Sequence, residues 1–558
     1  MKHVVMVLVL GLLAVCPACW AGDTPNALRI EAETAAVRTV GAQSFDAWNL
    51  FTVGMVADAV RVEQGGAFEI RVRAKGTPCR AVWPMATLVI DGFEPAYRMA
   101  EHRTWEDYTF QVELDTGLHM VGVSFPNDSM GGLEDRNLFI DYIEVEPLGE
   151  APTPVNAPYA EWLAQEQARE QKALEKARAA IPELRKSAAR ITVTGPDGAP
   201  AVDASVKVVL ERHAFLFGCN ILMFGQFGSP LENRVYKQRF ADAFNFATIG
   251  FYWKAFEMEK GKPRFYYSDQ ILAWCEEQDI AAKGHPLLWN YDEMLPAWAD
   301  AFPPEPAQQE RVESIVTHYK DEIRYWDVVN EPSRLGGVDL EKAYRWAREA
   351  NPEATLLVND FGILPGGYPA FYELVEDLIA KGVPIDGVGM QAHAPPDAAF
   401  PMHWVDRVLD HYAQLGKPIH ITEFLPISSG IPVTMAKWRG NWDEDTQAAY
   451  ARDFYTLCFA HPAVEAITWW DLSDAGAWLE GGGLLREDLT MKPAYKALLA
   501  LLQETWHTEE TGATGEQGEF AFSGFHGRYR VTAEKDGKTV ESTLELGKKG
   551  GEITLKLE

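Results

Sequence analysis

Hydrophobic and polar residues alternate in several different ways along the chain, and each pattern predicts a different structure. Residues 22–148 contain short runs such as AFEIRVRAK and YTFQVEL, in which apolar and polar residues alternate between Gly, Pro and Asp breaks. This alternation is typical of strands with one buried face, and several such strands favour a β-sandwich. Residues 149–158 (GEAPTPVNAP) then predict a Pro-rich linker.

A helical composition and two further β patterns flank the central part of the chain. Residues 159–189 are rich in Ala, Glu, Lys and Gln, which predicts one long, mostly solvated helix that breaks near Pro182. Two strands around a Gly/Pro turn follow, so we expect a helix and a small β lead-in over residues 159–213. Residues 515–558 alternate strictly between Gly turns and predict a small β-sandwich-like domain with a structural role.

Between residues 214 and 505, apolar strand-like runs alternate with amphipathic helical stretches, the pattern of repeated βαβ units. Eight such runs, separated by helical patterns, predict an α/β fold of the (β/α)8 TIM-barrel type. The alternative is a doubly wound open sheet, which usually has fewer strands, and no Gly-rich phosphate loop follows the first run. The runs are 215–221, 246–253, 280–289, 324–331, 355–360, 387–393, 418–424 and 466–472.

Length and charge narrow the classes of function. A chain of 558 residues exceeds what one hydrophobic core usually serves, so several domains are expected. The net charge of −30 argues against nucleic acid and anionic membrane surfaces as partners. It suits a soluble protein with a neutral ligand, and we expect a monomer.

The first 21 residues, MKHVVMVLVLGLLAVCPACWA, have a basic start, an apolar core and small residues at the end. This pattern predicts a secretory signal peptide over residues 1–21, and hence a secreted, periplasmic or cell-surface protein. The alternatives are a transmembrane anchor, for which the apolar run is too short, and a lipid anchor at Cys16 or Cys19. The other cysteines are scattered and without metal-like spacing, and we expect buried free thiols.

Two glutamates end predicted barrel strands: Glu331 the fourth and Glu423 the seventh. Strand ends of such a barrel meet at its C-terminal face, and glycosidic bond cleavage needs two carboxyl groups. Polar and aromatic residues at other strand ends suit a carbohydrate cleft, because hydroxyls need hydrogen-bond partners and sugar faces need aromatic platforms. These residues are His285, Trp289, Asn359, Asp360, Gln391, His393 and Trp470.

At this point residues 191–503 resemble the catalytic domain of glycoside hydrolase family 10, the retaining β-1,4-xylanase family. The resemblance rests on motifs in the family's order: GHPLLWN (284–290), WDVVNEP (326–332), VND (358–360), GVGMQAH (387–393), ITE (421–423), ITWWDLSD (467–474) and KPAY (492–495). It implies an endo-1,4-β-xylanase with xylan as partner and no cofactor for catalysis.

The resemblance also implies roles. Glu331 is expected to be the general acid/base and Glu423 the nucleophile, with carboxyl groups roughly 5–5.5 Å apart. Glu331 must arrive protonated and Glu423 ionised. The implied substrate-binding residues are Asn330, His285, Trp289, Gln391, His393, Trp470 and Trp478.

Several positions depart from the family pattern, and one of them is Asn290, which replaces a frequent histidine. Ile249 and Tyr252 stand where the family commonly has the Asn and Lys that bind the sugars at subsites −2 and −1. Leu425 replaces a frequent Asp that supports the histidine beside the nucleophile, so His393 lacks this partner. A decorated xylan or another β-glycan is therefore an open alternative substrate.

Residues 27–147 resemble calcium-dependent xylan-binding modules of the β-sandwich type, through IEAE (30–33) and FPNDSMGGLEDRNLFIDYIEVE (125–146). Calcium prefers several oxygen ligands, many of them carboxylates. The alternative is a solvated acidic loop. The resemblance implies a ligand-facing site and a separate structural site, with these candidate ligands: Asn127, Asp128, Glu134, Asp135 and Asn137 for the first, and Glu31, Glu33 and Asp141 for the second.

A third reading of the whole chain belongs to another class: a polysaccharide-binding protein with a non-catalytic barrel. The presence of both glutamates and of Asn330 argues against it. Binding of xylan without release of reducing ends would distinguish it from the hydrolase.

Overall fold

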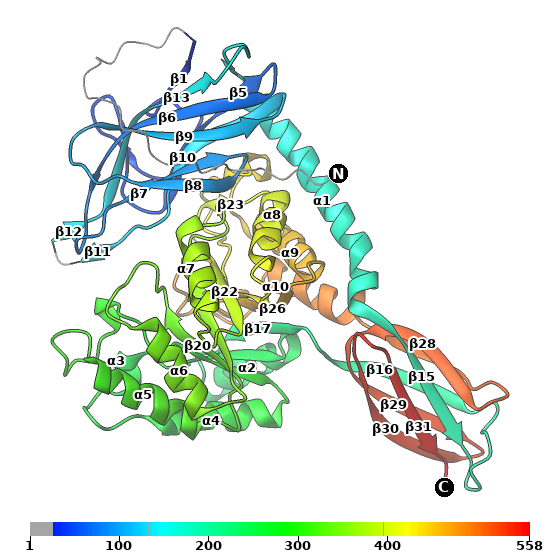
Figure 1. The fold of residues 1–558 in the computed structure, drawn as a ribbon. Helices are drawn as coiled ribbons and strands as arrows, with labels where there is room; N and C mark the ends of the chain where they lie inside the picture. Colours follow the sequence, from blue (N-terminus) through cyan, green and yellow to red (C-terminus); the bar gives the residue numbers. More distant parts are fainter. Residues whose placement is uncertain (1–25, 132, 394) are drawn as a thin grey trace.

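The computed structural model describes residues 26–131, 133–393 and 395–558, so the predicted signal peptide lies outside the described residues. Eight parallel strands close into a barrel and follow one another in chain order (Figure 1). The predicted fold class is confirmed, because each of the eight predicted runs forms one strand of this barrel. The strands are β17 (Leu216–Asn220), β18 (Phe246–Gly250), β19 (Ala281–His285), β20 (Tyr325–Asn330), β21 (Thr355–Asp360), β22 (Gly387–Ala392), β24 (Ile419–Phe424) and β26 (Val464–Trp469).

A helix follows each barrel strand and covers the outside of the barrel. Several of these helices start at capping side chains. Ser229 and Glu232 form a capping box at the start of α2, and Asp443 accepts a hydrogen bond from the Thr446 backbone N–H at the start of α9. The helices are α2 (Pro230–Ala243), α4 (Phe265–Glu277), α5 (Glu305–His318), α6 (Leu340–Ala350), α7 (Pro369–Ala380), α8 (Met402–Ala413), α9 (Glu444–Phe459) and α10 (Pro493–Ala500).

Shorter elements lie in the loops between strands and helices. The helical ones are α3 (Trp253–Phe256), the 3-10 helices at Asp292–Met294 and Lys437–Arg439, and a π-helical turn at Leu501–Thr505. Two short strands, β23 (Ala398–Ala399) and β25 (Thr434–Met435), pair in parallel above the barrel.

The N-terminal module consists of two antiparallel sheets with an apolar core between them. A hairpin of β11 (Met130–Gly131) and β12 (Glu134–Asp135) extends from it. One sheet contains β1 (Leu28–Glu31), β3 (Ala42–Gln43), β4 (Trp48–Leu50), β6 (Gly66–Thr77), β9 (Glu106–Leu114) and β13 (Asn137–Pro147). The other contains β2 (Val37–Arg38), β5 (Gly54–Val62), β7 (Met85–Ile90), β8 (Phe93–Met99), β10 (Gly117–Phe125) and β14 (Val155–Asn156).

The module packs directly on the barrel domain. Strand β5 shows why, because its alternate residues face two different cores: Val56 and Val60 lie in the core of the module, whereas Ala57 and Ala59 join the large core that includes the barrel. Strand β14 lies within the predicted linker and pairs with β5, so this segment is part of a sheet.

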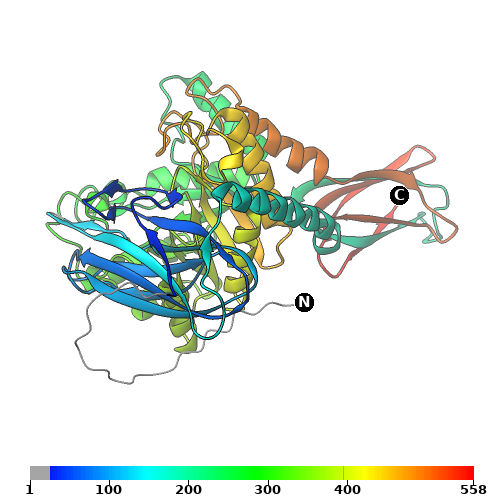
Figure 2. The ribbon, with the colours of Figure 1, turned by 90° about the horizontal axis from the view of Figure 1, so that it is seen from above.

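Helix α1 (Tyr159–Arg185) runs from the N-terminal module to the C-terminal sandwich (Figures 1 and 2). The predicted break near Pro182 is wrong, since the helix continues through this residue to Arg185. Pro182 lies in the last turn, where a missing N–H removes a single hydrogen bond. Buried residues at a helical spacing, among them Trp162 and Leu174, form a stripe that packs on α8 and α9.

The β lead-in and the C-terminal strands form one sandwich, although they lie far apart in the sequence. Its first sheet has the order β28 (Glu519–Phe525), β15 (Lys186–Thr194) and β31 (Gly551–Lys556). Its second sheet has the order β27 (Glu509–Ala513), β16 (Ser205–His213), β29 (Gly527–Lys535) and β30 (Lys538–Leu546). The sequence pattern indicated both sets of strands but not their pairing.

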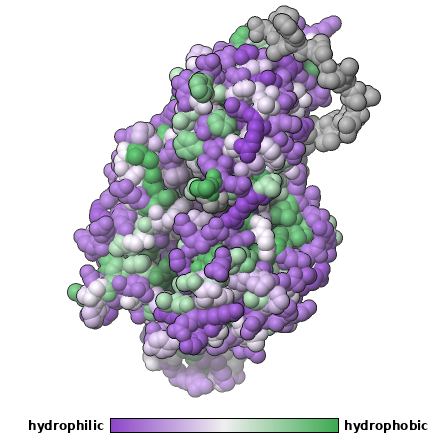
Figure 3. Space-filling model, turned by 90° about the vertical axis from the view of Figure 1, so that its left-hand side faces the viewer, coloured by the Kyte–Doolittle hydropathy of each residue, from purple (hydrophilic) through white to green (hydrophobic). Residues whose placement is uncertain are grey.

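The surface agrees with the composition. Hydrophilic side chains predominate on the face shown in Figure 3, and apolar ones form small patches. Among the described residues, no helix is long and apolar enough to cross a membrane. The cysteines of the described residues, Cys79, Cys219, Cys275 and Cys458, are buried free thiols.

Candidate active site

Glu331 and Glu423 lie at the carboxyl-terminal ends of two barrel strands that are separated by β21 and β22. Glu331 follows β20 directly, and its φ of 56° places it in the left-handed region, which a non-glycine residue rarely adopts. Its backbone N–H donates to the Asn359 carbonyl at 2.8 Å, which helps to hold this conformation. Glu423 lies within β24 and is 5% exposed.

Two side chains from the end of β22 connect the carboxyl groups. Gln391 Nε2 donates to Glu331 Oε1 at 3.3 Å, and Gln391 Oε1 lies 2.8 Å from His393 Nε2. The same histidine nitrogen lies 3.2 Å from Glu423 Oε2. A single chain of side chains therefore joins the two glutamates across the cleft.

Two asparagines provide a second connection between Glu331 and Glu423. Asn330 Nδ2 donates to Glu331 Oε1 at 3.2 Å, and Asn330 Oδ1 accepts from Asn359 Nδ2 at 2.8 Å. Asn359 Nδ2 also donates to Glu423 Oε1 at 2.9 Å. Both asparagines are buried, so this network fixes the relative position of the carboxyl groups.

The environment of Glu331 favours its neutral form. Burial raises the pKa of Glu331 to about 8, and the carboxylates of Asp360 and Glu423 contribute to the increase. Trp289 Nε1 donates to Glu331 Oε2 at 3.1 Å. At neutral pH, Glu331 is mostly protonated and can act as a proton donor.

The environment of Glu423 has the opposite effect. Burial alone would raise its pKa, but the hydrogen bond from His393 and the nearby His285 and Lys283 lower the pKa of Glu423 below its ordinary value. The carboxylate form is thus available for attack on an electrophilic carbon.

A buried ionic cluster of Lys283, His285 and Asp327 lies near Glu423. Asp327 Oδ2 lies 2.7 Å from Lys283 Nζ and 2.8 Å from His285 Nδ1. Burial alone would raise the pKa of Asp327, but Lys283 and His285 lower it to about 2. His285 Nε2 lies 4.0 Å from Glu423 Oε1. The cluster orients His285 and adds positive charge near Glu423.

Aromatic rings surround the carboxyl groups. Trp470 contacts His285 edge-on with a ring distance of 5.3 Å, and Trp478 contacts His393 in the same way at 4.7 Å. Tyr291 stacks on Trp289 at 4.8 Å. Trp478 is 60% exposed, which leaves its face open to a ligand.

Tyr252 is a site residue that the list of candidates lacked. Its ring lies 5.7 Å from that of His285 and 6.0 Å from that of Trp289. Burial and the carboxylates of Glu423, Asp471 and Glu331 raise the pKa of Tyr252. The signal was present in the sequence, since Tyr252 replaces a Lys of the family pattern, but only the fold shows that the phenol remains in the cleft.

The replacement of the family's Asp by Leu425 leaves one ring nitrogen of His393 without a hydrogen-bond partner among the described residues. Leu425 is buried, and among the described residues the Nδ1 atom of His393 is buried without a hydrogen-bond partner. Ile249, the other apolar replacement, is also buried.

The candidate calcium ligands of the module differ in whether their oxygen atoms already have hydrogen-bond partners. Asp128 Oδ1 and Asn137 Oδ1 are buried without a partner, and burial with a contribution from Asp135 raises the pKa of Asp128 to about 6. These oxygens fit a cation. Asn127 fits poorly, because its amide binds the Met85 N–H and the Trp83 carbonyl.

The remaining candidates are arranged less closely. Glu134 accepts a hydrogen bond from the Arg80 backbone N–H, and Glu31 pairs with Arg29. Glu33 Oε2 is buried without a partner, and burial raises the pKa of Asp141. Within the described ranges, no three His, Cys, Asp or Glu side chains converge on one metal-binding point, so amide and backbone oxygens would complete either site.

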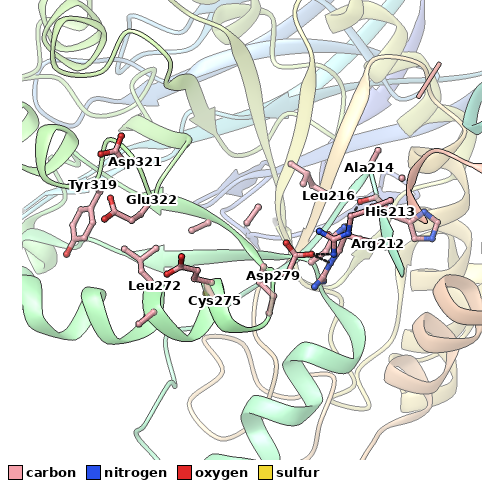
Figure 4. A pocket seen from close by; sticks show the side chains of 18 of the residues that line it. Arg212, His213, Ala214, Leu216, Leu272, Cys275, Asp279, Tyr319, Asp321 and Glu322 are labelled. Carbon is pink, nitrogen blue, oxygen red and sulfur yellow. Dashed lines mark hydrogen bonds and ion pairs between the residues drawn. The ribbon is translucent and has the colours of Figure 1, made fainter. Parts of the chain in front are cut away.

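A large cavity lies elsewhere, between α4, the amino-terminal end of the barrel and the C-terminal sandwich. Its volume is about 1050 Å³. Figure 4 shows side chains that line it, among them Arg212 and Asp279. Arg212 and Arg528 both pair with Asp279 at its wall. None of the predicted site residues lines it, so it is separate from the carboxyl groups.

The fold and the site define a (β/α)8-barrel protein with two buried carboxyl groups at its C-terminal face, and their pKa values are shifted in opposite directions. The chain belongs to glycosyl hydrolase family 10, whose model matches residues 220–501. Residues 69–157 match the family described as a Ca-dependent, xylan-binding carbohydrate-binding module. Both predicted resemblances are confirmed.

Known relatives are similar over part of their length. The chain is 29% identical over 399 residues to anti-sigma-I factor RsgI6 of Acetivibrio thermocellus, covering 68% of this chain and 49% of that protein. It is 29% identical to Endo-1,4-beta-xylanase 2 of Arabidopsis thaliana, covering 62% and 32%. For Endo-1,4-beta-xylanase B of Thermotoga neapolitana the identity is 27%, and the coverage is 47% and 81%. The chain thus spans half or less of the first two relatives.

Proposed function

We propose that the chain is a secreted retaining endo-β-1,4-xylanase that hydrolyses xylan with Glu331 as general acid/base and Glu423 as nucleophile. The observation that carries this proposal is the pair of buried carboxyl groups at the carboxyl ends of two strands of a family 10 barrel, linked to each other through Gln391, His393 and Asn359. The opposite shifts of their pKa values, upward for Glu331 and downward for Glu423, support it. Pairs of carboxyl groups with separated pKa values are typical of acid/base and nucleophile assignments.

The reaction follows from these protonation states. Glu331 donates its proton to the glycosidic oxygen while the Glu423 carboxylate attacks the anomeric carbon, which gives a covalent glycosyl-enzyme. Formation of this ester removes the negative charge of Glu423, and the pKa of Glu331 falls accordingly. The Glu331 carboxylate then accepts a proton from water, which attacks the anomeric carbon and releases a product of retained configuration.

The neighbouring side chains would hold the sugar at subsite −1. Asn330 lies beside the acid and would bond the 2-hydroxyl, while His285 would hold the next hydroxyl. Gln391 and His393 restrain the carboxyl groups. Three tryptophans would wall the subsite: Trp289, Trp470 and Trp478.

The test is hydrolysis of a panel of defined oligosaccharides from xylan, β-glucan and mannan, with the anomeric configuration followed by NMR. The proposal expects internal cleavage of xylo-oligosaccharides with initial release of the β-anomer. Initial release of the α-anomer, or binding of xylan without new reducing ends, would contradict it.

A second candidate keeps the chemistry and changes the substrate to a decorated xylan or another β-glycan. Tyr252 and the buried Ile249 favour it, because an alkyl group makes no hydrogen bond and a phenol has one donor where the ammonium group of Lys has three. The hydrogen bonds that Asn and Lys would make to sugar hydroxyls are therefore changed. Turnover of a substituted xylan without turnover of plain xylan would support this candidate over the first.

The N-terminal module would bind the same polysaccharide, with calcium held mainly by Asp128, Asp135 and Asn137. When bound, the cation would offer coordination positions to sugar hydroxyls. Removal of calcium with a chelator should weaken xylan binding, measured by calorimetry, more than it lowers hydrolysis of short soluble oligosaccharides. An equal loss of both would argue against this division of roles.

A further inference from the structure

Arg334 joins the acid side of the cleft to the N-terminal module. It lies three residues after Glu331, and its side chain is 2% exposed. Nε donates to Asp360 Oδ1 at 3.0 Å, and Nη2 donates to the Phe361 carbonyl. Nη1 donates to the carbonyl of Pro126, which belongs to the module. The guanidinium group therefore bonds to two adjacent residues of the barrel domain and to one residue of the module.

Asp360 holds the same turn from the other side. Asp360 Oδ2 accepts hydrogen bonds from the backbone N–H and the hydroxyl group of Ser333. The backbone N–H groups of Arg334 and Leu335 both donate to the Glu331 carbonyl at 3.2 Å. The left-handed conformation of Glu331 costs free energy, and such conformations persist where the surrounding structure fixes them.

Close packing shows that the module has a defined position here. Gly362 has a φ of +70°, and a Cβ atom at this residue would lie 2.7 Å from Arg334 Nη2. A few residues along the same loop, the Glu94 backbone N–H of the module donates to the Gly366 carbonyl at 2.7 Å. In return, the Tyr368 backbone N–H donates to Glu94 Oε2 at 3.0 Å. These contacts hold the module in a defined position against the barrel domain.

We propose that Arg334 is a positioning residue for Glu331, which fixes the turn at residues 331–335 between Asp360 of the barrel and the Pro126 carbonyl of the N-terminal module. The module then acts as a fixed wall of the catalytic unit beside the acid. This inference rests on the proposed role of Glu331. Among the described residues, the charged groups with the largest influence on Glu331 are Asp360, Glu423 and Arg334 itself.

The chain offers a matched control in Arg407 of α8. Arg407 also donates from a partly buried guanidinium group to a backbone carbonyl of the module, that of Asp91, and lies 5.6 Å from the ring centre of Phe93. Its partners do not include Asp360 or Glu331. Arg334→Gln and Arg407→Gln therefore remove the same kind of contact between the barrel domain and the module, but only the first affects the turn at the acid.

The experiment measures the pKa of the Glu331 carboxyl group by ¹³C NMR titration of the full chain, with Glu331→Gln to assign the signal. In Arg334→Gln, Asp360 loses its cationic partner, so the pKa of Glu331 should rise by about one unit. Arg334→Lys keeps the charge and should show a smaller shift. Arg407→Gln should leave the pKa of Glu331 unchanged while lowering the melting temperature.

An unchanged pKa of Glu331 in Arg334→Gln, or an equal shift in Arg407→Gln, would overturn the inference. If Arg334→Gln fails to fold, Arg334→Met, which also removes the charge, decides: a rise supports the inference and no change refutes it. The titration needs no turnover, so a wild-type protein that cleaves no glycan would refute the proposed function while the titration still tests Arg334.

Discussion

The two sides of the cleft use the same residue type in opposite environments. On the acid side, Glu331 lies close to the carboxylate of Asp360, and its pKa rises to about 8. On the nucleophile side, Glu423 lies close to His393, His285 and Lys283, and its pKa falls. Both side chains are buried, so burial alone does not separate them. The difference shows that the surrounding charges and hydrogen bonds separate the two pKa values.

Removal of either carboxyl group should have the largest effect and should differ between the two sides. Glu423→Ala should abolish turnover of every substrate, because no covalent intermediate can form. Glu331→Ala should slow xylan hydrolysis by about 10²–10⁴-fold. It should retain formation of the glycosyl-enzyme from an aryl xyloside whose leaving group needs no proton. Steady-state and burst kinetics on both substrates measure the difference.

Circular dichroism and melting curves of both variants would control for folding. Equal losses on the aryl xyloside in Glu331→Ala and Glu423→Ala would refute the assignment of separate roles.

The ionic cluster under the nucleophile side should matter for stability. Asp327→Asn leaves Lys283 buried without its counter-charge, and we expect a loss of about 3–5 kcal/mol in the free energy of unfolding. The depressed pKa of Asp327 means that its stabilisation is present above pH 3.8 and disappears as the pH falls through about 2. Denaturant titration at pH 7 measures the loss.

The double substitution Lys283→Met with Asp327→Asn is the control, since it removes both charges and should restore most of the stability. A single variant as stable as the wild type would show that this cluster is not a buried ion pair.

The dependence of kcat/KM on pH should reflect the shifted pKa values of both Glu331 and Glu423. Because the proposed role of Glu331 requires its protonated form, kcat/KM should fall as the pH rises through about 8. Asp360→Asn removes a negative charge near Glu331, so this alkaline limb should move to lower pH. The acidic limb, set by Glu423, should stay below the ordinary pKa of a glutamate. An alkaline limb that does not move in Asp360→Asn would contradict the proposed electrostatics of the acid side.

Local patterns were sufficient to predict the barrel and the places of its two glutamates. Each barrel strand is a short apolar run between helical patterns, and Glu331 and Glu423 stand at the ends of two of them. The cluster of Lys283 and Asp327 was not predicted, because a charged residue within a strand gives no sign of the strand with which it pairs. The pairing between β15 and β28 was hidden for the same reason, since it joins residues more than 300 positions apart in sequence.

Of the substitutions considered, Tyr252→Phe should have the smallest effect on kcat/KM. The phenol of Tyr252 lies near Glu423 and His285, so Tyr252→Phe removes one hydrogen-bonding group from the sugar site while keeping the ring. One such bond contributes about 1 kcal/mol, or roughly a fivefold change in kcat/KM. The informative readout is the ratio of kcat/KM for substituted and plain xylo-oligosaccharides. Tyr291→Phe, which alters a phenol stacked on Trp289, is the matched control. If Tyr252 determines which sugar the glutamates act on, only Tyr252→Phe should change this ratio, and an equal change in both variants would assign the effect to the general polarity of the cleft.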